Sequence, residues 1–289
     1  MGQKLCVIII LNLNGRNYTK NCLNSIKKNT FYKNYKVVVV DNNSTDGSQG
    51  LIKSRFKWVD LIENKKNRGF SGGNNDGIKY AIKKYDPSYL YLLNNDTLVK
   101  KKWLTEAIKT MNKSDKIGIV GSKQLNFNEK SAISAGWIRP WGINYYQGNI
   151  EKDVDWVSGA GFLVRRGVFK KIGLIDEIYN PAYYEETDFE KRAMKSGFKV
   201  IHSPKSIFLH KGGVTSNKEI NNFSELFYRN RFIYFIRNHG IFYFLPRMLF
   251  DCFREFRRGG FSKIIRLFYF YKKGYILIKE KNNLIKKTR

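Results

Sequence analysis

Cysteine is scarce in this sequence of 289 residues. The three cysteines, Cys6, Cys22 and Cys252, are an odd number without metal-finger spacing. This pattern argues against a disulfide framework and against a cysteine-bound zinc site. Free cysteines suit a reducing compartment, so we expect a cytoplasmic protein.

Long apolar runs are also lacking. The run at residues 5–11 is too short to span a bilayer or to form a secretory signal. The longest later run, residues 241–250, is interrupted by Pro246 and Arg247. We therefore expect no transmembrane segment.

Acidic residues are few beside the basic ones. The chain has 53 Lys and Arg against 24 Asp and Glu, a formal net charge of +29. A surface this basic attracts polyanions such as nucleic acid, acidic lipid headgroups or phosphorylated substrates. Charge alone does not choose among them.

The first 120 residues alternate short apolar runs with helical patterns. The runs at 5–11 and 35–41 are rich in β-branched residues, which is typical of strands buried on both faces. Further strands are predicted at 57–63, 89–93 and 117–120, and helices around residues 22–26 and at 71–84. This alternation predicts an α/β fold, a mostly parallel sheet with helices on both faces, which binds ligands beyond the carboxyl ends of its strands.

The remaining chain is less regular. Residues 121–180 suggest short strands and loops that line a cleft, followed by a helix at 185–196 and strands at 198–202 and 206–210. We expect a catalytic domain over residues 1–221, with a nucleotide-binding half at about 1–120 and an acceptor-side half at about 121–221. Residues 222–289 hold 16 Lys and Arg, four Asp and Glu, and 18 Phe and Tyr. This segment predicts a basic, aromatic, helical appendage.

Polar motifs follow two of the predicted strands. Asp41 can accept hydrogen bonds from a nucleobase or a ribose, or it can belong to an ordinary polar turn. Asp96, in the run Asn94-Asn95-Asp96, can hold a divalent cation that bridges two phosphates, or it can cap a turn. The glycine-rich run at 67–74 can bring backbone N–H groups and Arg68 to a phosphate, or it can be an ordinary loop.

Two more sites come from the second half of the domain. Glu185, Glu186 and Asp188 crowd the start of a helix, where acids are stabilised by the helix dipole or act as a general base. His210 ends a predicted strand just before Gly212 and Gly213, where an imidazole can serve as a metal ligand or play a structural part.

In this order the motifs resemble glycosyltransferase family 2, in its rhamnosyltransferase-like subgroup. The matching segments lie within roughly residues 5–215 and are residues 9–15, 40–47, 67–74, 92–97, 161–166 and 184–188. The resemblance implies a GT-A fold and an inverting transfer of a sugar from a nucleotide-diphosphate donor to a saccharide or lipid-linked saccharide. Such reactions serve cell-surface polysaccharide or glycolipid synthesis.

The resemblance also implies roles for individual residues. Asp41 would contact the base of the donor, and Asp96 and His210 would hold Mg²⁺ or Mn²⁺. Glu186 falls on the position of the catalytic base, beside Glu185, and is one methylene longer than the usual Asp. The other donor-binding positions are Asn12, Asn14, Asn43, Arg68, Gly69, Asn74 and Asn95.

For the appendage we expect either peripheral attachment to the anionic inner face of the cell membrane or a helical cap on the domain. A nucleic-acid-binding protein and a catalytically inactive nucleotide-binding protein are the rival interpretations of the whole chain. No recognised nucleic-acid-binding motif is present, so we expect no nucleic-acid partner.

Overall fold

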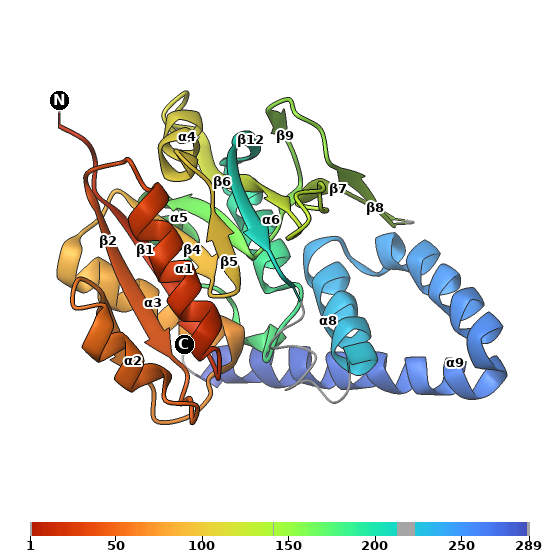
Figure 1. Cartoon of the computed structure of the whole chain (residues 1–289). Coiled ribbons are helices and arrows are strands. Elements are labelled where there is room, and N and C mark those ends of the chain that lie inside the picture. The colour runs from red at the N-terminus through yellow and green to blue at the C-terminus, as the bar shows by residue number, and fades with distance from the viewer. Residues whose placement is uncertain (1, 141, 213–222, 288–289) are drawn as a thin grey trace.

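The computed structural model describes residues 2–140, 142–212 and 223–287. A large mixed sheet runs through the molecule, with helices on both faces, and two helices from the C-terminal part extend beside it (Figure 1). The predicted domain boundary at residues 221 and 222 lies outside the described residues.

The sheet has the strand order β3-β2-β1-β4-β11-β6-β12-β5, with β9 paired to β12. Strands β3, β2, β1 and β4 are parallel, whereas β11 is antiparallel to both of its neighbours. The strands are β1 Cys6–Asn12, β2 Tyr35–Asp41, β3 Asp60–Glu63, β4 Tyr89–Asn94, β5 Thr97–Val99, β6 Ile117–Leu125, β9 Lys152–Asp153, β11 Gly161–Arg165 and β12 Lys199–His210. The α/β prediction is confirmed.

Helices cover both faces because the residues of each strand point alternately to either side. Cys6, Ile8 and Ile10 of β1 face one core cluster, and Val7 and Ile9 face the other. The first cluster is covered by α1 Arg16–Asn29, α2 Ser48–Arg55 and α4 Trp103–Met111, and the second by α3 Gly69–Tyr85, α5 Arg166–Ile172 and α6 Glu185–Lys195.

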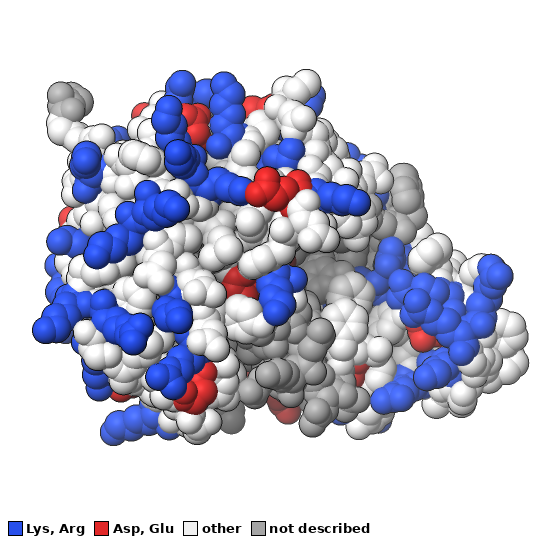
Figure 2. All heavy atoms as spheres, in the orientation of Figure 1, with Lys and Arg blue, Asp and Glu red and all other residues white. Residues whose placement is uncertain are grey.

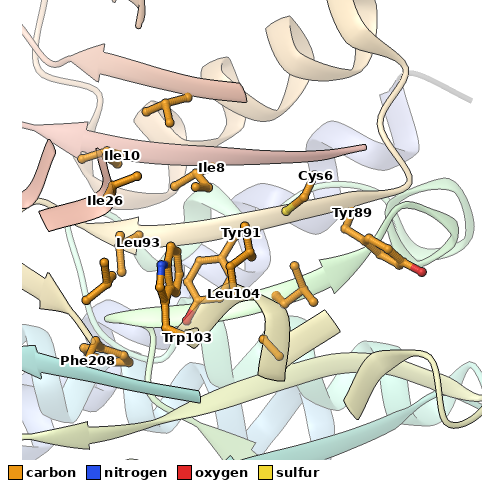
Figure 3. Close-up of a cluster of buried hydrophobic side chains, with 14 of the residues drawn as sticks. Cys6, Ile8, Ile10, Ile26, Tyr89, Tyr91, Leu93, Trp103, Leu104 and Phe208 are labelled. Carbon is orange, nitrogen blue, oxygen red and sulfur yellow. The ribbon is translucent and has the colours of Figure 1, made fainter. Parts of the chain in front are cut away.

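Trp103 is the largest buried side chain of the first cluster. Its ring meets Tyr91 edge-on at 4.6 Å between centroids, and Leu93 and Leu104 lie around the pair (Figure 3). The indole N–H donates to the Thr30 hydroxyl, so this wide side chain is buried with its polar atom satisfied.

Three parts of the fold differ from the prediction. The strands expected at 198–202 and 206–210 form one strand, β12, with an irregularity between Ser203 and Ile207. The predicted sheet did not include β5, and neither α2 nor α4 was predicted. The short strands predicted within residues 121–180 include β7 Ala135–Arg139, β8 Gly142–Tyr146 and β10 Trp156–Val157, but these pair in a separate small sheet that was not predicted.

The C-terminal part consists of α8 Phe223–Asn238 and α9 Ile241–Lys287, and α9 is broken at Gly259 and Gly260. The two helices pack around a third apolar cluster that also takes in Tyr179 and Tyr184 of the domain. At its centre the Arg231 guanidinium pairs with Asp251, which also accepts from the Tyr271 hydroxyl at 3.0 Å. No helix within the described residues has the length and apolarity needed to cross a membrane.

The packing of α3 on the sheet generates a stability prediction. A Cβ at Gly77 would lie 2.6 Å from Ile9 Cγ2 and 2.9 Å from Val40 Cγ2. We expect Gly77→Ala to lower the free energy of unfolding by about 1–3 kcal/mol, because overpacking outweighs the gain in helix propensity. Gly50→Ala in α2 is the control: no atom lies within 4 Å of its Cβ, so about 0.5–1 kcal/mol of stabilisation should appear in urea unfolding. A stabilised Gly77→Ala would contradict this packing.

Candidate active site

The site begins where β1, β2 and β4 end together. Asn12 of β1 is in register with Asp41 of β2, and Leu11 is in register with Asn94 of β4. Because these strands are parallel, the polar residues at their carboxyl ends meet at one edge of the sheet.

Asn12 is fully buried at this edge and joins the strand ends. Its amide donates to Asp41 at 2.6 Å and accepts from Asn95 at 2.9 Å and from the Thr19 hydroxyl at 2.7 Å. Gly15 makes room for this contact, since a Cβ there would lie 2.2 Å from the Asn95 amide nitrogen. The network fixes three of the predicted residues in one cluster.

Asp41 is completely buried and accepts from three donors. Besides Asn12, these are the backbone N–H of Ser44 at 2.8 Å and the side chain of Gln49 at 2.7 Å. Of the three donors, only the half-buried Gln49 side chain can move away without unfolding the turn. The Asp41 carboxylate thus shapes the 42–48 turn and has one oxygen that another donor can reach by replacing Gln49.

The turn after β2 holds two more predicted residues. Asn14 is exposed and accepts from the backbone N–H of Thr45 at 2.9 Å. Asn43 is exposed at the tip, with a φ of 70° that asparagine tolerates better than most residues. Both side chains border the Asp41 cluster on the solvent side.

The glycine-rich run lies against the same edge. The buried side chain of Asn42 donates to the carbonyl of Gly69 at 3.0 Å and to Asn67 at 3.1 Å. Arg68 pairs with Asp76 at 3.0 Å and with Glu177 at 3.3 Å, and Asn74 donates to the Phe70 carbonyl within the first turn of α3. The loop is therefore held to β2, and Arg68 is partly neutralised by two carboxylates.

Asp96 and His210 meet at the end of β4. The His210 Nε2 atom lies 3.1 Å from the Asp96 Oδ1 atom, and the backbone N–H of Lys211 donates to the Asp96 carbonyl. The pairing of β12 with β5 brings His210 opposite Thr97 and so fixes this distance. In the described part of the chain no third His, Cys, Asp or Glu joins them.

Two protein ligands are enough for a cation that phosphate oxygens and water also coordinate. Neighbouring ligands on an octahedral ion with bonds of about 2.1 Å stand about 3 Å apart, which matches the Asp96–His210 distance. Imidazole together with carboxylate suits Mn²⁺, and carboxylate alone suits Mg²⁺. The residues present therefore fit a divalent cation.

Three carboxylates gather at the start of α6. Glu185 and Glu190 are buried and each has one oxygen without a hydrogen-bond partner, whereas Glu186 is partly exposed. The other oxygen of Glu190 accepts from the backbone N–H of Val157 at 3.2 Å. Burial raises the pKa of all three, and the charge of Glu186 further raises the pKa of Glu185 and Glu190.

One short segment connects this acidic cluster to the strand ends. The backbone N–H of Asn94 donates to the carbonyl of Ala160, and a Cβ on the adjacent Gly159 would lie 3.3 Å from the Glu186 side chain. The chain from 159 to 160 thus lies between Glu186 and the residues that precede Asp96. The predicted residues fall into one connected region.

Sequence reasoning missed several residues of this region. Asn42 and Ser44 lie within the matching segment 40–47, but neither was predicted to be a site residue. Glu190 was not considered, although it lies one helical turn after Glu186 on the same face of α6. The four-residue spacing between Glu186 and Glu190 is the sequence feature from which Glu190 could have been predicted.

The chain is similar in fold to two solved structures that contain Mn²⁺ with a nucleotide or a nucleotide sugar. The chain superposes on GalNAc-T7 with UDP, GalNAc and Mn²⁺ with a TM-score of 0.66 and 15% identity, over 94% of this chain and 54% of that one. The mannosyltransferase PcManGT from Pyrobaculum calidifontis, in complex with GDP-Man and Mn²⁺, gives a TM-score of 0.56 and 13% identity, over 98% of this chain and 76% of that one. The fold is therefore the expected GT-A fold.

Sequence comparison also finds relatives that are named as glycosyltransferases. The low-salt glycan biosynthesis hexosyltransferase Agl10 of Haloferax volcanii is 26% identical over 78% of this chain and 74% of that protein. An N-acetylglucosaminyl-diphospho-decaprenol L-rhamnosyltransferase of Mycobacterium tuberculosis is 23% identical over 70% of this chain and 75% of that protein. The model of glycosyl transferase family 2 matches residues 7–173. The chain belongs to this family, and it is a glycosyltransferase of glycan or polysaccharide synthesis.

The buried carboxyl of Glu190 generates a prediction on pH. Its pKa is raised above the ordinary value of 4.5, so the folded state holds a proton that the unfolded state releases. Stability is therefore lost as the pH rises from about 4.5 through the folded-state pKa. Glu190→Gln keeps the acceptor for Val157 and carries no charge. We expect it to be about 1–3 kcal/mol more stable than the wild type at pH 8 and nearly equal at pH 4.

Thermal unfolding at the two pH values measures this difference. Glu280→Gln, which changes an exposed carboxylate on α9, is the control and should show no such trend. An advantage of Glu190→Gln that is the same at pH 4 and pH 8 would show that folding does not change the proton binding of Glu190, which would contradict a raised pKa.

Proposed function

We propose that the chain transfers a hexose or rhamnose, with inversion, from a nucleotide-diphosphate sugar to a hydroxyl group of a saccharide or lipid-linked saccharide. The observation that supports this most is the connected region around Asp41, Asp96 and Glu186, which provides a group for each part of such a reaction. The relatives named for hexosyl and rhamnosyl transfer, and the neighbours solved with UDP or GDP-Man, support the same assignment.

The nucleotide would lie over the ends of β1 and β2. A base N–H takes the place of the Gln49 side chain at Asp41, and Arg68 with the 67–74 loop lies beside the donor. The polar side chains around this position are Asn12, Asn14, Asn43, Asn74 and Asn95, and the backbone of Gly69, which is bonded to Asn42 and Asn67, lies beside them. Because Asn12, Asn14, Asn74 and Asn95 are already hydrogen-bonded within the chain, the donor would meet a site that needs little reordering.

Asp96 and His210 would hold the divalent cation, Mg²⁺ or Mn²⁺. When bound, the cation supplies positive charge against the departing nucleotide diphosphate. His210 ends β12, and Asp96 lies in the short turn between β4 and β5, so paired strands fix the positions of both residues.

Glu186 would remove the proton from the acceptor hydroxyl. As the acceptor oxygen bonds to the anomeric carbon, the bond from that carbon to the diphosphate oxygen breaks on the opposite face, which inverts the configuration. A raised pKa makes Glu186 a better base than an ordinary carboxylate at neutral pH, provided that it is ionised. Burial raises the pKa of Glu186, and the charge of Glu186 in turn raises the pKa of the buried Glu185 beside it.

We expect Glu186→Gln to lower kcat about 10²- to 10⁴-fold, because the amide keeps the shape but cannot take the proton. The measurement is sugar transfer from a panel of nucleotide sugars with Mn²⁺ or Mg²⁺, and the panel also identifies the donor. Glu186→Asp, which restores the usual base of the family, is the matched control and should retain most of the activity. Transfer by Glu186→Gln near the wild-type rate would refute the assignment of the base.

We further propose that α9 attaches the protein to the cytoplasmic, inner face of the membrane. Its first half carries a stripe of exposed apolar side chains at three- and four-residue spacing: Phe242, Leu245, Leu249, Phe253 and Phe256. Arg254, Arg257 and Arg258 lie beside this stripe, and Figure 2 shows Lys and Arg gathered at that end of the molecule. An apolar stripe flanked by cations is typical of interfacial helices.

Nucleic acid is not a proposed partner. Figure 2 shows the other cations of the visible face spread among white patches rather than gathered in one groove. The Asp41 and Glu186 clusters at the candidate site would repel phosphodiesters that are not accompanied by a cation.

Replacing Phe242, Leu249 and Phe253 by serine should weaken binding to vesicles that contain phosphatidylglycerol by about a hundredfold, since each large side chain contributes substantial burial in the interface. A matched control replaces Phe31, Phe127 and Ile150, which are exposed to a similar extent on the domain. Co-sedimentation with vesicles measures both. Equal binding by the α9 variant and the wild type would show that this stripe is not the anchor.

A further inference from the structure

The segment just before the acidic cluster has an unusual set of hydrogen bonds. Residues 180–184 join the short helix η1 Glu177–Tyr179 to α6 without regular structure. The Tyr184 carbonyl accepts from the backbone N–H of Asp188 in α6, whereas the carbonyls of residues 179–183 accept from donors in distant parts of the chain. The amide nitrogen of one side chain lies within hydrogen-bond distance of three of these carbonyls and shares its two N–H groups among them.

That side chain is Asn230 of α8. Its amide nitrogen lies 2.6 Å from the Tyr179 carbonyl oxygen, 2.8 Å from that of Ala182 and 2.9 Å from that of Tyr183. Asn230 is completely buried, and its own oxygen accepts from Arg229 Nε at 2.9 Å. Every polar atom of this amide is therefore used.

The carbonyls of Asn180 and Pro181 have partners on both sides of the site. Arg229 donates to the Asn180 carbonyl at 2.6 Å. The backbone N–H of Phe70, in the glycine-rich loop, donates to the Pro181 carbonyl at 2.9 Å, and the Asn180 amide donates to the carbonyl of Arg68 at 3.1 Å. The segment thus connects the donor loop to α8.

The same segment holds a backbone conformation that its residues disfavour. Tyr183 and Tyr184 have φ values of 80° and 72°, in the left-handed region that large side chains rarely adopt. They directly precede Glu185 and Glu186. Such a conformation persists only where the surrounding contacts impose it, and here these are Asn230 together with the rings of Phe227 and Tyr234 on Tyr184.

We propose that Asn230 is a positioning residue for the acidic cluster: it holds residues 179–184 in the strained conformation that places Glu185 and Glu186 at the start of α6. This inference rests on the proposed function for its catalytic consequence. It makes the C-terminal helices part of the active site, because the side chain that sets the approach to the base comes from α8.

Asn230→Asp tests the proposal, since it keeps the shape of the side chain and replaces the donor by an oxygen that faces three carbonyls. We expect kcat for sugar transfer to fall about tenfold to a hundredfold, with the KM for the donor changed much less. Amide hydrogen exchange over residues 179–188 should become at least about tenfold faster. Wild-type kcat in the folded variant would overturn the proposal, even with faster exchange.

Ile233→Ala is the matched control. Ile233 is buried on the same helix and faces Gly274 of α9, so its truncation loosens the helix pair without touching the 179–183 carbonyls. It should lower the unfolding temperature and speed exchange in α8 and α9, yet leave kcat of the folded protein near the wild-type value. A kcat loss equal to that of Asn230→Asp would overturn a specific role for Asn230.

Two further outcomes are separable. If Asn230→Asp does not fold, Arg229→Met is the second variant. It removes the bond to the Asn180 carbonyl and the bond to the Asn230 oxygen, so kcat should fall, but less than in Asn230→Asp. An unchanged kcat would refute the proposal. If the wild type transfers no sugar, the proposed function fails, and hydrogen exchange alone decides whether Asn230 holds the segment.

Discussion

The hydrogen bond from Asn12 to Asp41 is the contact on which the site depends. It joins the ends of two parallel strands, and Asn95 and Thr19 extend it to the end of β4 and to α1. Slipping the register of β1 by one residue would turn Asn12 to the other face of the sheet and leave Asp41 buried without its shortest bond. The apolar pairing of the strands and the polar cluster at their ends therefore require the same register.

In the acidic cluster, the constraint is which of the three carboxyl groups carries the negative charge. Glu185 and Glu190 are buried where charge is disfavoured, and their raised pKa values show that the fold accepts them best as neutral groups. Glu186 is the member with access to solvent. Two neighbours that resist ionisation leave the negative charge to the one carboxylate that an acceptor can reach. A chain that placed all three in water would lose this distinction.

The C-terminal helices pack on the domain with one face, and the membrane attachment that we propose would use another. Their inner face packs around Arg231 and Asp251 and presents Arg229 and Asn230 to the domain, whereas the outer face of α9 keeps its phenylalanines exposed. An ion pair so deeply buried adds little net stability, but it fixes how α8 and α9 pair. A membrane contact on the outer face would thus act on helices that also hold the approach to Glu186.

Periodicity and motif order predicted the α/β fold, the strands β1, β2 and β4 and the helices α3 and α6, because these have long apolar patterns and clear ends. They did not predict α4, or that β12 is one strand with an irregularity, since short amphipathic helices and a mid-strand Pro204 look like loops. The predicted site residues could be placed at strand ends from the sequence. The roles of Glu190 and Asn230 could not, because each depends on contacts with residues far away in the chain, such as Val157 and Tyr179.

The most direct test is a crystal structure of the wild-type protein with a nucleoside diphosphate and Mn²⁺. The account predicts the base beside Asp41 in place of the Gln49 side chain, the cation on Asp96 and His210, and Glu186 facing the diphosphate across the space for a sugar. A nucleotide bound away from the ends of β1, β2 and β4, or a cation that contacts neither Asp96 nor His210, would contradict it.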